Sequence, residues 1–510
     1  MSEHLTPLDA TFLELEQADE SAHMHIGGIM VFDPLPNGGP PSREDVCRHL
    51  SSRLGQLPRY SQRLSQPHVG GLSWPEWEDD PAFEMSRHVA RAALPAPGGY
   101  EELAEWSSGF FSVRLDRHRP LWEMALLEGL AGGRWALAHK THHSIVDGVG
   151  SVDVGHLILD ATPDASSSSD ASAAAGGEAG SPAGAGRRTS GEHSSAPGPL
   201  ASLAHVWAGL VPVESIRQAA EMGAHGVLHP REALRNARAG IDLILREELH
   251  AAPRTSLNQP IGTRRRFDVV QVSLEDLREI KGALGGTVND VVLTVTASGL
   301  RALLQYRGEA LPAKGLRAMV PMNLRVASEH LALGNRISSM YVELPVTEAD
   351  PVRRYRETVA RSASLKSAGE QAAGSTAVIE FTGVAPPVIH AMLAQSLYAT
   401  RLFNVTVTNV PGPRQTLYAF GAPLREVHPL VPLAAEHAVG VAAVSYDGSV
   451  FFGIVADHDT VPDLDVLVSA MGASVEELLS AARAEGRRTG GGAPRSRRRR
   501  AVARSSGGSR

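Results

Sequence analysis

The chain is short of cysteine and of long apolar runs, and each shortage excludes a class of protein. Cys47 is the only cysteine among 510 residues, which excludes an intramolecular disulfide framework and a thiolate metal cluster. No apolar run reaches the roughly 18 residues that a membrane-spanning helix needs. The first residues lack a cationic segment followed by an apolar one, so no signal peptide is predicted. We therefore expect a cytoplasmic protein whose membrane contact, if any, is peripheral.

The C-terminal end lacks acidic residues and is rich in arginine. Residues 487–510 contain nine arginines and no acid, and because the whole chain carries a net charge of −7, the remainder carries −16. Such a tail is predicted to be disordered. Clustered arginines bind anionic lipid or nucleic acid through charge alone, and of the two we favour lipid. A solvated tail without a partner is the alternative.

Composition divides the chain into five segments. Residues 1–161 and 264–484 mix predicted strands with predicted helices, so each is interpreted as an α/β lobe. Residues 162–199 are dense in Ala, Gly, Ser and Pro, which predicts a flexible linker. Residues 200–263 form a helical connecting region, whose apolar stripe favours packing on the body over docking on a membrane. The ordered part is expected to end near Ala484, before a tail at 485–510.

Alternating apolar residues and capping residues predict the main elements of both lobes. A helix is expected from Ser42 to Gly55, and Ser273 is expected to cap another through a capping box. A third helix is predicted over 288–306. The predicted strands are residues 26–32, 134–140, 267–272, 316–322, 338–344, 404–408, 439–446 and 450–455.

The segment 141–150 carries the most specific chemistry, with His142 and His143 followed by Asp147 and Gly148. It follows a predicted strand, and strand-to-loop junctions often hold catalytic groups on a rigid scaffold. An imidazole is suited to take a proton from a hydroxyl near neutral pH, and we assign this role to His143. Neighbouring side chains in a strand face opposite ways, so His142 is expected to position or support the site. Asp147 either faces His143 or, as we favour, forms a salt bridge that shapes the loop, where Gly148 permits a tight turn.

No nucleophile accompanies these histidines. The chain has no G-x-S-x-G sequence, and Cys47 lies in a predicted helix without an evident cationic activator. Direct transfer from an activated donor such as a thioester is therefore favoured over an acyl-enzyme. A metal site on His143 and Asp147 lacks a convincing third ligand, so no metal is expected. His23 and His25 are interpreted as core or surface residues rather than ligands.

The motifs taken together resemble one family, the bacterial wax ester synthases/acyl-CoA:diacylglycerol acyltransferases. That family belongs to a wider superfamily similar to chloramphenicol acetyltransferase and to the condensation domains of peptide synthetases. The resemblance covers about residues 5–480, interrupted by the linker. Its motifs are residues 7–13, 23–27, 120–123, 128–130, 142–148, 287–293, 320–325, 334–336, 408–413, 445–448 and 461–463.

The resemblance implies an α/β fold of two similar lobes, each a mixed sheet with helices, and an active-site channel between them. His143 would deprotonate a long-chain alcohol or diacylglycerol, whose oxygen attacks the thioester of acyl-CoA to give a wax ester or triacylglycerol. Acyl-CoA is then a substrate, and no cofactor is expected. Contact with an anionic membrane or lipid droplet is expected because the substrates are lipids. The alternative is a condensation-type transferase that esterifies a secondary metabolite with carrier-bound acyl groups.

The resemblance also implies residues that line the channel or support the site, and each has a simpler reading. Asn289 and Asp290 support the site or else cap a helix start. Thr408 shares a strand face with Thr406, and strand propensity is favoured over donation to an oxyanion. Apart from the resemblance, Arg317 and Arg325 are candidates for the arginine that pairs with Asp147. The full set of supporting residues is Asn289, Asp290, Pro120, Leu121, Trp122, Thr408 and Asn409, of which Trp122 is favoured as a core aromatic.

Overall fold

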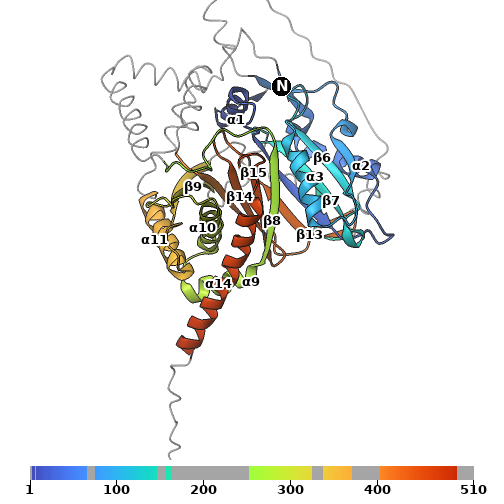
Figure 1. The fold of residues 1–510 in the computed structure, drawn as a ribbon. Helices are drawn as coiled ribbons and strands as arrows, with labels where there is room; N and C mark the ends of the chain where they lie inside the picture. The colour runs from blue at the N-terminus through green and yellow to red at the C-terminus, as the bar shows by residue number, and fades with distance from the viewer. Residues whose placement is uncertain are drawn as a thin grey trace, which may run out of the picture.

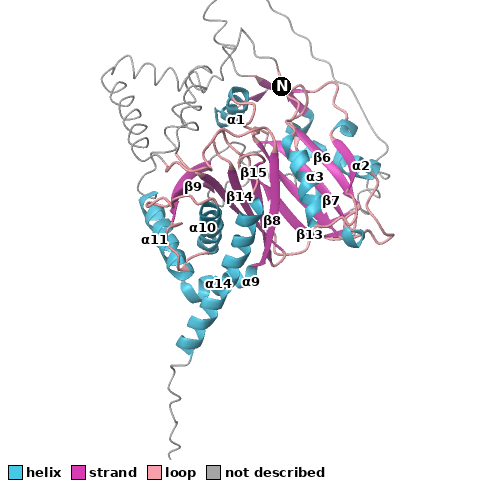
Figure 2. Ribbon diagram, in the orientation of Figure 1, coloured by secondary structure: helices cyan, strands magenta, loops and turns pink. Residues whose placement is uncertain are grey.

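Two six-stranded sheets and one small sheet make up the fold (Figures 1 and 2). The computed structural model describes residues 3–5, 7–65, 75–145, 155, 157–163, 252–323, 337–369 and 402–490. Both large sheets are mixed, with one parallel strand pair in the first and two in the second. Helices accompany each of them, so the fold is the two-lobed α/β arrangement that the sequence predicts.

The first sheet belongs mainly to the N-terminal lobe. Its central strands β2 and β7 are antiparallel and pair along their whole length, from His25 opposite His142 to Phe32 opposite Trp135. In spatial order the strands are β12 (Tyr418–Ala419), β13 (Ala422–Leu430), β2 (His25–Phe32), β7 (Trp135–His142), β6 (Trp122–Glu128) and β5 (Val89–Ala93). The small sheet consists of β1 (Glu3–His4), β4 (Glu76–Asp79) and β3 (Gln62–Leu64).

In the part of the C-terminal lobe that the structure describes, the second sheet packs with four helices. Its strands in spatial order are β10 (Ile337–Leu344), β9 (Leu316–Asn323), β11 (Val405–Pro411), β14 (Val439–Tyr446), β15 (Ser449–Asp457) and β8 (Arg265–Ser273). The helices are α9 (Leu274–Leu284), α10 (Val288–Tyr306), α11 (Pro351–Gly369) and α14 (Leu464–Gly490). Helix α10 is buried over most of its length because its neighbours α9, α11 and α14 surround it (Figure 1).

The helices of the N-terminal lobe are α1 (Pro7–Ala18), α2 (Arg43–Arg53) and α3 (Tyr100–Ser112). Helix α3 lies between the two large sheets and covers the edge strand β8. The Ser108 hydroxyl accepts from the Phe267 amide at 2.9 Å, and the Ser112 hydroxyl accepts from the Arg265 amide at 2.7 Å. These hydrogen bonds satisfy backbone amides of the edge strand β8. On an uncovered edge strand such amides are free to pair with a strand of another molecule. Short 3₁₀ helices are Leu54–Gln56, Pro58–Ser61, Met85–Arg87 and Ala131–Gly133.

The C-terminal half of the chain contributes two strands, β12 and β13, to the N-terminal sheet. Where β13 meets β15, Gly453 approaches the Pro429 carbonyl so closely that an added Cβ would lie 1.7 Å from its oxygen. Also on β13, Glu426 accepts from Arg134 at 2.6 Å and from Tyr100 at 2.9 Å, two residues of the N-terminal lobe. The sheets therefore do not divide the chain at one sequence boundary.

Most of the strands and helices named from the sequence are confirmed, with differences at their ends. Helix α2 ends at Arg53 and a 3₁₀ turn follows, whereas the prediction ran to Gly55. Ser273 accepts from the amides two and three residues on, but forms only this half of a capping box. Helix α14 continues to Gly490, beyond the expected end at Ala484; a pair between Arg488 and Glu485 at 3.4 Å and the basic last turn favour the extension. Residues 164–199 of the linker, residues 200–251 of the predicted helical connecting region and residues 491–510 lie outside the described residues. The described end of that connecting region, residues 252–263, contains turns and loop but no helix.

Candidate functional site

The two histidines of the motif lie where β7 ends. His142 is its last residue and His143 begins the following turn. The His142 amide donates to the Leu121 carbonyl at 2.9 Å, and the His143 amide donates to the Met24 carbonyl at 2.8 Å. The backbone of the pair is thus held on both sides, by the start of β6 and by the residue before β2.

His142 is buried, and its ring orientation is fixed by the residue two positions on. Its Nδ1 accepts from the Ser144 amide at 3.1 Å and lies 2.7 Å from the Ser144 hydroxyl. This arrangement assigns the ring proton to Nε2, which faces Glu16 at 3.7 Å. Burial lowers the pKa of His142 to about 3. A neutral ring with both nitrogens directed at protein groups is suited to positioning rather than to proton transfer with a substrate.

His143 is half-buried and packs against helix α1. Its imidazole stacks on the Phe12 ring, with centroids 4.0 Å apart and planes 20° apart. Burial lowers the pKa of His143 to about 4, and the residue's own backbone carbonyl acts in the opposite direction. The ring is therefore neutral near pH 7 and can accept a proton.

A carboxylate that the sequence analysis missed lies behind the histidine pair. Glu16 on α1 is 2% exposed and accepts from Arg117 Nε at 3.1 Å and Nη2 at 3.0 Å. Arg114 is 3.3 Å from the same oxygen, and His25 Nε2 is 3.5 Å from the other. Burial alone would raise the pKa of Glu16, but the hydrogen bond with His25 and the surrounding charges outweigh it and lower the pKa. Glu16 is thus an ionised centre that joins α1, β2, β7 and the loop before β6. Glu16 lies one helical turn after Phe12, so the two side chains share a face of α1. That spacing identifies Glu16 only if Phe12 is already known to face the site.

The histidines at 23 and 25 lie in the core beside this carboxylate. His23 is 3% exposed and His25 is 2% exposed, and their rings stack with centroids 5.6 Å apart. Burial lowers the pKa of His23 to about 3 and also lowers that of His25. Within the residues that the structure describes, no group of three or more His, Cys, Asp or Glu side chains is arranged to hold a metal ion.

The Pro120, Leu121 and Trp122 segment supports the histidine turn from the next strand. All three residues are buried. Leu121 provides the carbonyl that holds His142, while the Trp122 indole donates to the Tyr60 carbonyl at 2.7 Å. Trp122 is thus a core aromatic with its polar atom satisfied.

A second set of predicted residues gathers where α10 meets β11. Asp290 is the capping carboxylate of α10, accepting from the Thr287 amide at 2.8 Å. The neighbouring Asn289 accepts from the Asn409 amide group at 3.4 Å. Thr408, half-buried on β11, adjoins Asn409. The structure therefore brings Asn289 and Asn409 together.

This second set is not joined to the histidine pair. In the described part of the chain, no hydrogen bond or ion pair links it to His142 or His143. Arg317 makes a hydrogen bond to the Leu402 carbonyl at 3.3 Å and lies 3.8 Å from Glu343. The remaining predicted residues Asp147, Gly148 and Arg325 lie outside the described residues.

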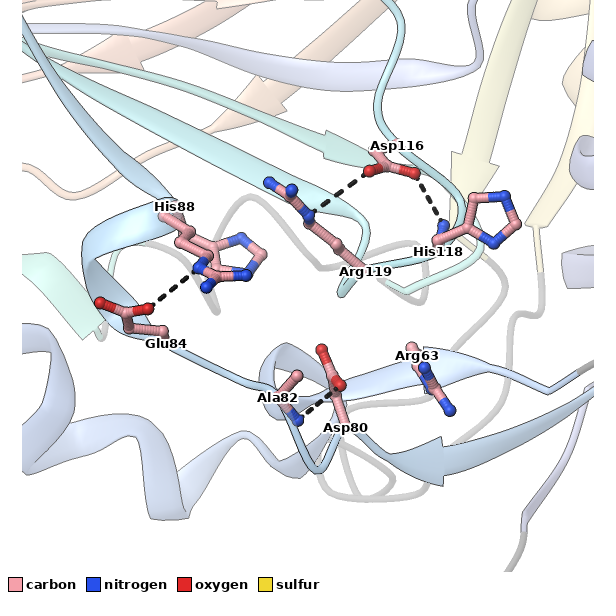
Figure 3. Close-up of a pocket in the computed structure, with 9 residues that line it drawn as sticks. Arg63, Asp80, Ala82, Glu84, His88, Asp116, His118 and Arg119 are labelled. Atoms are coloured by element: carbon pink, nitrogen blue, oxygen red, sulfur yellow. Dashed lines mark hydrogen bonds and ion pairs between the residues drawn. The ribbon is translucent and has the colours of Figure 1, made fainter.

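A pocket of about 220 Å³ opens elsewhere on the N-terminal lobe (Figure 3). It is smaller than the roughly 300–1,000 Å³ of typical small-molecule sites. Its arginines already have carboxylate partners, for example Arg87 with Glu84 at 2.9 Å and Arg119 with Asp116 at 3.4 Å. Neither histidine of the motif lines it, so we do not place the reaction there.

Comparison with known proteins identifies the family. The model of the wax ester synthase/diacylglycerol acyltransferase catalytic domain matches residues 5–292, and that of the WS/DGAT C-terminal domain matches residues 333–479. The Mycobacterium tuberculosis protein named "Probable diacyglycerol O-acyltransferase tgs1" is 33% identical over 478 residues, 94% of this chain and 96% of its own. A second protein of that organism, tgs2, is 31% identical over 486 residues, 94% of this chain and 99% of its own.

Solved structures show the same fold. The wax ester synthase/diacylglycerol acyltransferase from Marinobacter aquaeolei VT8 superposes with a TM-score of 0.63 at 26% identity, covering 94% of this chain and 99% of its own. The first condensation domain of the CDA synthetase superposes with a TM-score of 0.54 at 16% identity, covering 94% and 97%, which shows the fold alone. The chain belongs to the wax ester synthase/diacylglycerol acyltransferase family and is an acyltransferase.

Proposed function

We propose that the protein transfers an acyl group from acyl-CoA to the hydroxyl of diacylglycerol or of a long-chain alcohol, and so makes triacylglycerol or wax ester. The relatives named as diacylglycerol O-acyltransferases and the Marinobacter structure support these substrates. The observation that carries the proposal is the neutral imidazole of His143, held at the end of β7 by the Met24 carbonyl and the Phe12 ring.

The reaction follows from one base and an activated donor. His143 takes the hydroxyl proton as the oxygen attacks the thioester carbonyl, so a carbon–oxygen bond forms and the carbon–sulfur bond then breaks. The proton passes from the imidazolium to the departing thiolate, which leaves as free CoA. Burial raises the pKa of the Cys47 thiol, and a thiol that stays protonated is a poor nucleophile. The direct route without an acyl-enzyme is therefore favoured.

The supporting residues have distinct proposed roles. His142 and Glu16 hold the turn that carries the base, while Asp147 and Gly148 shape the loop that follows. Asn289 and Asn409 support the opposing side of a channel between the lobes. A condensation-type enzyme with carrier-bound donors is the alternative, but the condensation domain shares only 16% identity against 33% for the acyltransferase.

The inferred acceptors partition into lipid, so we place the reaction at the surface of an anionic membrane or lipid droplet facing the cytoplasm. No helix within the described ranges has the length and apolarity to cross a bilayer. The acidic body makes the arginines of residues 487–510 the natural contact for anionic headgroups. Acyl-CoA acts as substrate, and the proposal requires no cofactor.

One assay tests the function and the base together. Purified protein receives labelled palmitoyl-CoA with either hexadecanol or dioleoylglycerol, and the labelled lipid and free CoA are measured. His143→Ala should lower the rate by roughly 10²-fold or more. His139→Ala on the same strand is the matched control, because burial also lowers the pKa of that histidine to about 4. A folded His143→Ala variant with an unchanged rate would refute the base assignment, and absence of labelled ester with either acceptor would refute the substrates.

A further inference from the structure

The N-terminal motif at residues 7–13 has entered the mechanism so far only through the contact of Phe12 with His143. In the structure it forms the first half of α1, and that helix brings Phe12 against His143. Phe12 is 8% exposed and packs in a small cluster with Leu15, Ala22 and Met24. Met24 also supplies the carbonyl that binds the His143 amide. One cluster thus contacts both the backbone and the ring of the same histidine.

Two arginines from the loop before β6 fix helix α1 in place. Arg117 donates to the Leu13 carbonyl at 2.7 Å and Arg114 donates to the Glu16 carbonyl at 2.7 Å, in addition to their ion pairs with the Glu16 carboxylate. Phe12 and Glu16 are one helical turn apart and so share a face. On that face Phe12 contacts His143, and Glu16 faces His142. A helix held by two arginines therefore presents one side chain to each histidine.

We propose that Phe12 is a positioning residue for acyl transfer, because its ring sets the plane of the His143 imidazole and so the direction of the nitrogen that takes the proton. The proposal rests on His143 being the base. A stacked aromatic ring limits rotation about the last side-chain bond of histidine, which sterics alone restrict weakly. It also excludes water from one face of the imidazole, and its electron-rich face attracts the imidazolium that forms when the proton is transferred.

The elements packed around Phe12 and His143 each contribute charged or titratable groups. Helix α1 contributes Glu16, the segment entering β2 contributes His23 and His25, β7 contributes His142, and the loop before β6 contributes Arg114 and Arg117. Burial, rather than any of these charges, is the main cause that holds the pKa of His143 low. Loss of the Phe12 ring should therefore let water reach the imidazole and raise its pKa towards 6.5.

The test compares substitutions of two phenylalanines, each of which stacks on another aromatic ring. Phe12→Leu keeps an apolar side chain but removes the flat aromatic ring that stacks on His143. Phe32→Leu removes a similar stack, on Trp135 at 4.3 Å and 12°, from the opposite end of β2 and β7. We expect Phe12→Leu to lower kcat roughly tenfold with KM changed less than about twofold. We also expect kcat of Phe12→Leu to fall as the pH drops through about 6, whereas kcat of the wild type should stay constant between pH 8 and 5.5. Phe32→Leu should lower Tm without this fall in kcat, and Phe12→Tyr should restore the constant profile.

The outcomes separate this proposal from the assignment of the base. Active His143→Ala would overturn the base, whatever Phe12 does. If His143→Ala is inactive while folded Phe12→Leu keeps the wild-type kcat and pH profile, Phe12 does not position the ring. The same holds if Phe32→Leu produces an equal fall in kcat at acid pH. Should Phe12→Leu fail to fold, Phe12→Met, which is nearer in volume, carries the same expectation, and all rates are taken where circular dichroism shows the folded state.

Discussion

Replacing Glu16 by glutamine should reduce both stability and rate. The change keeps the shape of the side chain but removes the charge that Arg114 and Arg117 share. Removing one member of a buried ion pair costs about 3–5 kcal/mol. Because the two arginines are 32% and 31% exposed, water compensates part of the loss, and we expect about 3 kcal/mol or less. At roughly 2–4 °C per kcal/mol, Tm should fall by at most roughly 6–12 °C.

The effect on catalysis is separated from the effect on stability by a second buried carboxylate. Glu426 is bound by Arg134, Tyr100 and His428 in the same lobe. Glu426 on β13 lies opposite Val31 on β2. Val31 is six residues along β2 from His25, so at the spacing of residues in a strand Glu426 lies about 20 Å from the histidine end of the sheet. Glu426→Gln should therefore destabilise to a comparable extent and leave kcat per folded molecule unchanged.

Glu16→Gln should lower kcat roughly 10- to 100-fold, since a displacement of about 1 Å in a catalytic group has effects of this size. Free CoA is followed by thiol release from palmitoyl-CoA, with hexadecanol or dioleoylglycerol as acceptor, at a temperature below both transitions. Equal rates for Glu16→Gln and Glu426→Gln, each scaled to its folded fraction, would show that the Glu16 cluster serves stability alone.

Three further outcomes follow from burial and close packing. Asp290→Ala should lower Tm through the loss of about 1–2 kcal/mol, because it removes the carboxylate half of the capping box of α10, leaving the Thr287 half, and takes away the closer acceptor of the Ser362 hydroxyl; thermal unfolding measures this. Gly453→Ala should prevent folding or cost about 3 kcal/mol or more, because its Cβ would meet the Pro429 carbonyl. The control Gly472→Ala, in an open part of α14, should be neutral or stabilising. Soluble yield and Tm are compared for the two variants. His23, His142 and His143 have folded pKa values of about 3–4, below the unfolded value near 6.5. Unfolding therefore takes up protons below pH 6.5, and stability should fall by up to about 1.4 kcal/mol per pH unit for each of them; a Tm that stays constant from pH 7 to 5.5 would contradict this.

Local patterns in the sequence were sufficient to predict the elements that carry the histidine pair. Strand β7 is a run of buried residues, and the helix from Val288 to Tyr306 has an apolar face behind the Thr287 cap, so each is encoded within its own segment. For two candidates, the local contacts expected of the simpler reading are present. Asp290 is a helix cap, and Trp122 is a core aromatic. In both cases the partner lies near in sequence or in the adjacent core.

Features that depend on distant segments could not be predicted in the same way. Strand β13 joins the N-terminal sheet through pairing with β2, almost 400 residues earlier, and Pro423 and Pro429 within it disguise its strand character. Glu16 reads as an ordinary acid on a helix until Arg114, Arg117 and His25 are placed around it. Pairing across such separations leaves no periodic signal in either segment.

The charge balance around the histidine pair explains why it stays neutral. A carboxylate 3.5 Å from His25 and 3.7 Å from His142 would ordinarily stabilise an imidazolium on one of them. Here burial is the main cause that disfavours a proton on either ring, and the ion pairs of Glu16 with Arg114 and Arg117 offset the attraction of its carboxylate for such a proton. His143 next to them is consequently not adjacent to a permanently charged imidazole, which would oppose its own protonation. A base that must gain and lose a proton in each turnover is best placed beside neighbours that hold their protonation state, and burial, together with the two arginines paired with Glu16, provides that condition.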